Sequence, residues 1–294
     1  MAIPQTTGEK RLRPMGVDIG ATLAKLAMRA PDGSLQLEFL SAGDLRGIDR
    51  RIADVAPDRL GLTGCGASAA AARLHRPTRS CLEFEAWGRG ARILLRSQGF
   101  QEESPYLLVS LGTGTSILRV EGETVTRLGG TALGGGTLVG LGAALTGCRT
   151  HAEICHLAEQ GDRGKIDLRV GDIYAEGEIP LPGETTAASF GGLARSGLGE
   201  GGREAPSPTN SARPEDLAAA VIGLVGENVA LVCSGIAQAA GISRLVFGGA
   251  TLHENPALAS ILTGVTGLMG NQPILLESGS FAGAVGALDT AAEA

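Results

Sequence analysis

The chain has 294 residues, of which 46 are glycine and only nine are aromatic. This length allows one large domain or two of medium size, and a hydrophobic content of 43% excludes a largely disordered chain. A net charge of −6 and a pI near 5.3 argue against nucleic acid as a partner, because phosphate backbones would not be attracted.

The cysteines and the apolar segments exclude further classes. Five cysteines without a CxxC pair indicate neither a disulfide framework nor a zinc or iron–sulfur site, and they favour a reducing, cytoplasmic location. Residues 1–14 carry three basic residues and no apolar core, so we expect a frayed lead-in rather than a secretory signal. Residues 128–148 are uncharged but rich in Gly and Thr, which indicates a glycine loop entering a helix and not a membrane span.

Two segments of similar pattern lie 92 residues apart. Residues 17–28 and 109–120 each contain an apolar strand, a turn of small residues and a second strand. Glycine-rich turns of this kind let backbone N–H groups approach a phosphate. The duplication predicts two similar domains that face each other across a cleft.

The remaining elements alternate between strand and helix patterns. We expect, in chain order, a strand at 59–62, a helix at 82–99 with Leu82, Ala86 and Leu94 on its buried stripe, a helix at 137–145, an exposed loop at 196–213, a helix at 214–240, a strand at 244–247 and a helix at 281–288. The alternation predicts an α/β protein. Another glycine-rich α/β domain is the alternative.

Asp18 and Lys25 are the first residues that suggest chemistry. Asp18 precedes the first glycine turn, where a carboxylate could bind nucleotide-associated Mg²⁺ through water, or could simply cap its own turn. Lys25 lies in an otherwise apolar strand, so it must either extend to solvent or meet an anion. At the second turn, the hydroxyls of Thr113, Thr115 and Ser116 are weaker evidence, because turns favour such residues anyway.

Three further side chains are candidates for catalysis. Glu83 or Glu85, near a helix start, could be a general base, although an acidic first turn also complements the helix dipole. Arg127 could bind an anionic group, or could be an exposed Arg at a strand end. The glycines at 134–136 precede a helix, and we expect them to present free N–H groups. The four histidines show no metal-ligand spacing and receive no role.

Taken together, these segments resemble the type II (eukaryotic-like) pantothenate kinases of the acetate and sugar kinase/Hsc70/actin superfamily. The similarity extends in unbroken order over about residues 15–290. The matching stretches include GVDIGAT at 16–22 with Lys25, LTGCGA at 62–67, EFE at 83–85, YLLVSLGTGTSI at 106–117, RLGGTALGGGT at 127–137, GDIY at 171–174, VFGG at 246–249 and FAGAVG at 281–286.

The resemblance implies a fold, an activity and a set of partners. The fold would be two ribonuclease H-like (actin-like ATPase) domains facing a nucleotide cleft, divided as residues 1–103 and 104–294, with the dimer interface in the second. The activity would be ATP- and Mg²⁺-dependent phosphorylation of pantothenate in coenzyme A biosynthesis. The enzyme would be a cytoplasmic homodimer, with acyl-CoA as a possible feedback ligand and no membrane partner.

The resemblance also implies residue roles. Glu83 would be the catalytic base, Arg127 would bind substrate and charge, and Thr113 and Ser116 would lie near pantothenate. Asp18 would lie at the Mg²⁺ and phosphate centre. The remaining nucleotide contacts would come from Gly20, Thr22, Lys25, Gly112, Gly114, Gly135, Gly136, Gly248 and Gly249.

Two positions depart from the family pattern. Ala21 and Cys65 stand where the family has glycine, and a positive φ at Ala21 would strain its methyl group and weaken ATP binding. A kinase of another small alcohol or sugar is an alternative function. A regulator that only binds nucleotide or acyl-CoA is another, but it would not need Glu83 as a base.

Overall fold

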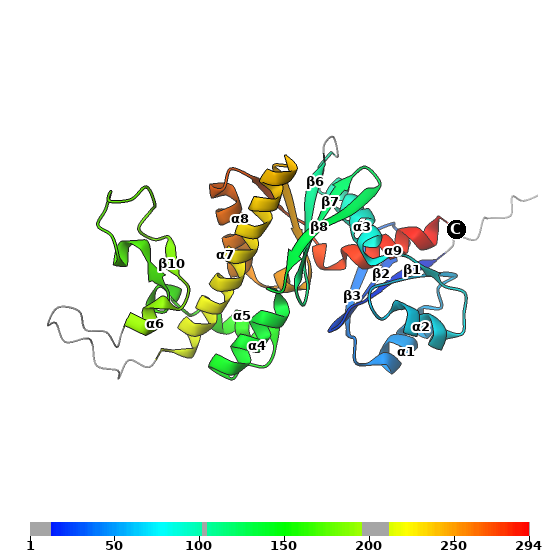
Figure 1. Cartoon of the computed structure of the whole chain (residues 1–294). Coiled ribbons are helices and arrows are strands. Elements are labelled where there is room, and N and C mark those ends of the chain that lie inside the picture. The colour runs from blue at the N-terminus through cyan, green and yellow to red at the C-terminus, as the bar shows by residue number, and fades with distance from the viewer. Residues whose placement is uncertain (1–12, 102–104, 196–211, 294) are drawn as a thin grey trace, which may run out of the picture. The chain divides into compact units, whose positions relative to one another are not determined.

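The computed structural model describes residues 13–101, 105–195 and 212–293. Most of the expected lead-in at 1–14 and most of the expected loop at 196–213 lie outside these residues. The chain forms two compact units, and each is described by itself (Figure 1).

The first unit is built on a five-stranded sheet of order β3-β2-β1-β4-β5. β1, β2 and β3 pair antiparallel, whereas β4 and β5 continue the sheet in parallel with β1. The strands are β1 (Pro14–Ile19), β2 (Leu23–Arg29), β3 (Leu35–Ser41), β4 (Arg59–Thr63) and β5 (Arg79–Ser80). The expected first hairpin and the strand near residue 59 are therefore confirmed.

Helices cover both faces of this sheet. Buried residues of α1 (Leu45–Val55) and α2 (Ala67–Leu74) pack on Met15, Val17 and Ile19. On the other face, α9 (Ala282–Ala292) crosses β1 and β4 and packs against α3 (Glu83–Ser97). A Cβ at Gly16 or at Gly61 would overlap the backbone of α9, so glycine there lets a helix lie directly on the strands.

The second unit repeats the same strand arrangement. Its sheet has the order β12-β11-β6-β7-β8, with β11 parallel to both β6 and β12. The strands are β6 (Tyr106–Leu111), β7 (Thr115–Glu121), β8 (Thr124–Thr131), β11 (Arg244–Gly248) and β12 (Gln272–Leu275). Because the order matches β3-β2-β1-β4-β5 strand for strand, the duplicated hairpins mark a duplicated sheet.

The core of the second unit is organised around the long helix α7 (Pro214–Ala240). Pro at its first turn and Gly241 in the left-handed conformation at its end set the expected bounds. α4 (Gly135–Thr146), α5 (His151–Ala158) and α8 (Pro256–Leu268) pack against it. By length and composition alone α7 could cross a membrane, but 61% of its most apolar window is buried, as in the core helix of a soluble protein.

A smaller substructure is anchored to α7 by a polar network. It contains η1 (Arg163–Lys165), β9 (Leu168–Arg169), η2 (Val170–Asp172), β10 (Thr186–Ala188) and α6 (Gly191–Arg195). Arg163 contacts Asp167 at 2.7 Å and Glu227 of α7 at 3.0 Å. The GDIY segment therefore belongs to a structured extension of the second unit.

The units do not follow a single division of the chain. The second unit begins at Pro105, next to the expected boundary. Two later segments, Arg119–Thr126 and Leu276–Ala294, nevertheless lie with the first unit, and Figure 1 shows the red helix α9 among blue and cyan elements. The reason is that α9, at the end of the chain, packs on β1, β4 and α3 of the first unit. One boundary in the sequence cannot assign it to that unit.

Candidate active site

Asp18 and Lys25 lie opposite each other on β1 and β2. They are paired in the antiparallel register, and Nζ of Lys25 is 3.5 Å from Oδ2 of Asp18. Asp18 is only 2% exposed. Of the two alternatives for Lys25, the structure supports contact with an anion, and that anion is the carboxylate of its own hairpin.

Two glycines make room for the Asp18 carboxylate. A Cβ at Gly64 would lie 2.5 Å from Oδ1, and a Cβ at Gly283 would lie 2.6 Å from Oδ2. Burial raises the pKa of Asp18, although the charge and hydrogen bond of Lys25 oppose this. Among the described residues Lys25 is the only side chain that pairs with Asp18, so the carboxylate retains capacity for further donors or for a cation.

The turn between β1 and β2 contains the expected nucleotide contacts Gly20 and Thr22. The N–H of Gly20 donates to the carbonyl of Leu23 at 3.0 Å, so it closes the turn and is not free. A Cβ at Gly20 would lie 3.3 Å from Nζ of Lys25. Glycine therefore gives access to the lysine amine here, while Thr22 is exposed.

The two departures from the family pattern carry no backbone strain. Neither Ala21 nor Cys65 is among the residues with positive φ in the described part of the chain. In the loop after β4 the left-handed position is Gly64, with φ of +86°. The condition under which the Ala21 methyl would strain the first turn is therefore not met, because Ala21 does not have a positive φ.

Glu83 is the first residue of α3. Partial desolvation raises its pKa, the negative charge of Asp18 adds to this, and Lys25 lowers it. Glu83 therefore lies near enough to the Asp18–Lys25 pair for both charges to act on its carboxylate. The raised pKa of the Glu83 carboxyl is closer to neutral pH, where a general base is most efficient.

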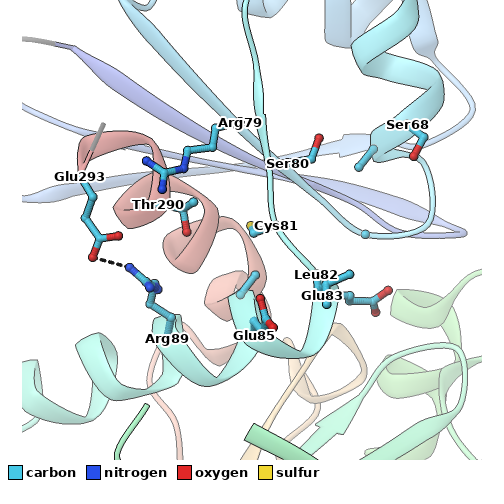
Figure 2. Close-up of a pocket in the computed structure, with 13 residues that line it drawn as sticks. Ser68, Arg79, Ser80, Cys81, Leu82, Glu83, Glu85, Arg89, Thr290 and Glu293 are labelled. Carbon is cyan, nitrogen blue, oxygen red and sulfur yellow. Dashed lines mark ion pairs between the residues drawn. The ribbon is translucent and has the colours of Figure 1, made fainter. Parts of the chain in front are cut away.

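A cavity of about 500 Å³ lies within the first unit, beside the start of α3. Its lining includes Glu83, Glu85, Arg79 and Arg89. Figure 2 shows the carboxylates of Glu83 and Glu85 pointing to different sides of the helix start. Arg89 forms ion pairs with Asp289 and Glu293. The charges on this side of the cavity are therefore already paired and stabilise the packing of α3 against α9.

The buried stripe of α3 differs from the expected one at its first member. Ala86 and Leu94 are buried as expected, but Leu82 is 70% exposed. Leu82 occupies the N-cap with extended backbone, and the helix begins one residue later. Its side chain therefore does not follow the helical periodicity.

In the second unit, the turn Gly112–Gly114 packs directly on the start of α4. The N–H groups of Gly135 and Gly136 donate to the carbonyls of Gly112 and Thr113 at 2.8 and 2.9 Å. The expectation of free N–H groups at these two glycines is wrong, because the β6–β7 turn already accepts from them. A Cβ at Gly135 or Gly136 would meet Thr251 or Thr113 at 2.7 or 3.0 Å, so the glycines serve close packing.

Thr251 joins this turn to the end of β11, and it is not among the residues selected from the sequence. Its hydroxyl donates to the carbonyl of Gly112 at 2.8 Å, and its own carbonyl lies 3.0 Å from Nε2 of His151. Just before it, Gly249 has φ of +117° and no space for a Cβ against Leu111. Gly248 and Gly249 therefore bring the η3 turn (Ala250–Leu252) against the end of β6.

Arg127 lies within β8 and is exposed. A Cβ at Gly130 would lie 2.8 Å from its guanidinium and 3.4 Å from Cα of Ser116. Gly130 thus leaves room for the guanidinium beside Ser116. No described residue forms a hydrogen bond or an ion pair with the Arg127 side chain, so its charge is available to an external anion.

The hydroxyl candidates at the second turn have different environments. Thr113 is exposed, whereas Thr115 is buried and donates to the carbonyl of Leu133 at 2.7 Å. Ser116 is half-buried on β7. Thr113 and Ser116 can therefore reach a ligand, and the hydroxyl of Thr115 is used by the fold.

Known families and proteins resemble this chain along most of its length. A model of the family Fumble matches residues 64–290. The type II pantothenate kinase of Staphylococcus aureus (strain USA300) is 32% identical over 274 residues, covering 93% of this chain and 98% of that protein. The chain belongs to the Fumble family of type II pantothenate kinases. The resemblance inferred from the ordered motifs is thereby confirmed.

Solved structures of low sequence identity share the fold. Component A of (R)-2-hydroxyglutaryl-CoA dehydratase from Acidaminococcus fermentans has a TM-score of 0.61 at 15% identity, covering 96% of this chain and 98% of that one. A ROK family glucokinase from Streptomyces griseus, in complex with glucose and AMPPNP, has a TM-score of 0.59 at 14% identity, covering 96% and 100%. The expected α/β fold of two actin-like ATPase domains is confirmed.

For this Fumble family member, the structure brings the candidate residues together in two groups. The first unit joins Asp18, Gly20 and Lys25, with Glu83 near enough for the two charges to act on it. The second unit joins the Gly112–Gly114 turn to the helix start at Gly135 and, separately, Arg127 to Ser116. No group of three or more His, Cys, Asp or Glu residues in the described ranges could hold a metal ion by itself.

Proposed function

We propose that this chain phosphorylates the 4'-hydroxyl of pantothenate with ATP, giving 4'-phosphopantothenate, the first step of coenzyme A biosynthesis. The observation that carries the proposal is the 32% identity to a type II pantothenate kinase along nearly the whole chain. The Asp18–Lys25 pair, with Glu83 near it, supplies side chains suited to the reaction. A protein that only binds nucleotide would not need this base.

Glu83 is proposed as the general base. Its carboxylate would accept the proton of the substrate hydroxyl as the oxygen attacks phosphorus in line. Its raised pKa supports this role, since desolvation and the charge of Asp18 both favour proton uptake. Such a base typically contributes about 10²- to 10⁴-fold to the rate.

Asp18 and Lys25 are proposed to bind the phosphates and Mg²⁺ of the nucleotide. The residues fit such a group, because the buried carboxylate has one cationic partner at 3.5 Å and glycines beside both of its oxygens. Magnesium bound with ATP would neutralise charge on the transferred phosphoryl group. Lys25 would contact the same group, and Gly20 and Thr22 would border it.

The second unit is proposed to supply the remaining contacts. Arg127, Thr113 and Ser116 would bind pantothenate, the arginine through the charge that no described residue neutralises. The turn glycines would lie near the phosphates and the adenosine of the nucleotide. They would contact it through backbone groups other than the N–H groups of Gly135 and Gly136, which are already hydrogen-bonded. These glycines are Gly112, Gly114, Gly135, Gly136, Gly248 and Gly249.

We also propose a cytoplasmic homodimer. α7 exposes Leu231 and Val232, and the end of α8 exposes Leu268 and Met269, the former at 85%. A second copy of the chain covering these side chains would remove apolar surface from water. Light scattering should give about twice the 29.8 kDa of one chain; a monomer mass at micromolar concentration would contradict the proposal. Acyl-CoA as a feedback ligand is proposed from the family resemblance alone.

The function is tested by measuring ADP release with a panel of acceptors. Pantothenate, pantetheine, pantoate and hexoses are supplied in turn with ATP and Mg²⁺. We expect the highest turnover with pantothenate. Faster turnover of a hexose, or no activity above background with any acceptor, would refute the proposal.

A further inference from the structure

Trp87 is the only tryptophan of the chain, and it lies beside Asp18. The position that a Cβ would take on Gly283 is 2.6 Å from Oδ2 of Asp18 and 3.1 Å from Nε1 of Trp87. Both atoms thus border one small space, which exists because residue 283 is glycine. The separation is within the reach of a direct contact after a small movement, or of one bridging water.

The two groups complement each other chemically. Trp87 is 5% exposed, and no described residue accepts a hydrogen bond from its indole N–H. Asp18 is 2% exposed and receives only the 3.5 Å contact from Lys25. An indole N–H can only donate and an ionised carboxylate can only accept, so the two groups are suited to each other.

The placement on α3 connects this pair to the site. Trp87 follows Glu83 by four residues, so both side chains project from the same face of the helix. Nε1 of Trp87, on that face, borders the same space as Oδ2 of Asp18, and the charge of Asp18 also acts on Glu83. Asp289, Glu293 and Arg89 form their own ion pairs farther along α3 and α9.

We propose that Trp87 is a positioning residue for Asp18, with its indole N–H donating to Oδ2 directly or through one water molecule. The bond fixes the orientation of the carboxylate and helps to keep it charged before nucleotide arrives. The catalytic consequence rests on the proposed function; the pairing itself does not. Trp87→Phe, which retains an aromatic ring and removes the donor, should lower kcat about tenfold and leave the KM for pantothenate unchanged.

The pairing is tested by a double-mutant cycle on ligand-free protein. Urea unfolding is followed by circular dichroism for Trp87→Phe, Asp18→Ala and the double variant. We expect Trp87→Phe to raise the unfolding equilibrium constant about tenfold in the wild-type background. In the Asp18→Ala background the same substitution should change that constant hardly at all. Equal effects in both backgrounds would overturn the proposal, whether or not the enzyme is a pantothenate kinase.

A matched control and a second measurement complete the test. Asp49 pairs with Arg73 in the same unit, on the helices that cover the opposite face of the sheet, so Asp49→Ala should be additive with Trp87→Phe. If Trp87→Phe does not fold, the fluorescence of the single tryptophan still decides the matter. Its emission should change in Asp18→Ala and stay unchanged in Asp49→Ala, whereas emission unaffected by Asp18→Ala would overturn the pairing.

Discussion

The hydroxyl of Thr251 and the carbonyl of Gly112 form a hydrogen bond of 2.8 Å between residues that are 139 positions apart in the sequence. The bond connects the η3 turn after β11 to the glycine turn after β6. Both turns follow the carboxyl ends of neighbouring parallel strands, the edge where open α/β sheets bind ligands. The glycine turn of the second unit is therefore positioned by a side chain from the adjacent strand end.

Replacing Thr251 by Val should loosen this turn. The loss of one hydrogen bond to the Gly112 carbonyl should lower the free energy of unfolding by about 1 kcal/mol and raise the KM for ATP. Thr251→Ser retains the hydroxyl and serves as the control. Urea unfolding and ATP titrations of both variants provide the measurement, and equal behaviour of Val and Ser would show that the hydroxyl does not hold the turn.

Glu83 and Glu85 should differ in their contribution to catalysis. Glu83→Gln removes the proposed base, so kcat should fall about 10²- to 10⁴-fold while pantothenate still binds. Glu85→Gln should cost far less, because the Glu85 carboxylate points to another side of the helix start (Figure 2). Steady-state kinetics decide between them. The reverse ranking would assign the base to Glu85, and full activity of both variants would remove the general-base role.

Local sequence patterns were sufficient to predict some of the elements. The glycine hairpins, the helix from Pro214 to Gly241 and the helical start near Glu83 all depend on turn chemistry and periodicity within a few residues. The candidate residues Asp18, Lys25 and Glu83 could be selected for the same reason, since their neighbours in the chain already make them unusual.

Tertiary contacts explain what the sequence did not predict. Leu82 looked like a core residue until the helix start one position later placed it in solvent. The N–H groups of Gly135 and Gly136 looked free because their acceptors lie more than twenty residues away. The place of α9 in the first unit, and the roles of Thr251 and Trp87, likewise depend on segments that meet only in the folded chain.

His151 should make the protein less stable in mild acid. Its pKa is lowered below 6.5, chiefly because burial disfavours the charged ring, with His253 adding to the effect while the Thr251 carbonyl and Glu254 oppose it. The unfolded chain therefore binds a proton more readily, so the contribution of His151 to stability is lost as pH falls from about 6.5 through the folded pKa.

The effect is measured by urea unfolding at pH 7.5 and pH 5.5. Wild type should lose more stability over this interval than His151→Gln, which can still donate to the Thr251 carbonyl but does not titrate. Subtracting the stability loss of His151→Gln from that of the wild type removes the contribution of the carboxylates, including Asp18, because both proteins contain them. An identical loss in both proteins would exclude His151 as the source.

Gly64 and Gly140 should respond in opposite ways to the same substitution. Gly64 has φ of +86°, and an added Cβ would lie 2.5 Å from both Oδ1 of Asp18 and the carbonyl oxygen of Ile19. Gly64→Ala should therefore lower the free energy of unfolding by about 2 kcal/mol or more, since the backbone is strained and the buried carboxylate must move. Gly140, on α4, has open space around it, so Gly140→Ala should raise that free energy by about 0.5 to 1 kcal/mol through helix propensity.

Because displacement of Asp18 also disturbs the proposed phosphate centre, Gly64→Ala should weaken ATP binding, whereas Gly140→Ala should not. Urea unfolding measures the change in stability, and isothermal titration calorimetry with ATP and Mg²⁺ measures the change in ATP affinity. Normal ATP affinity in a destabilised Gly64→Ala protein would show that Gly64 is needed for the backbone conformation and not for the position of Asp18.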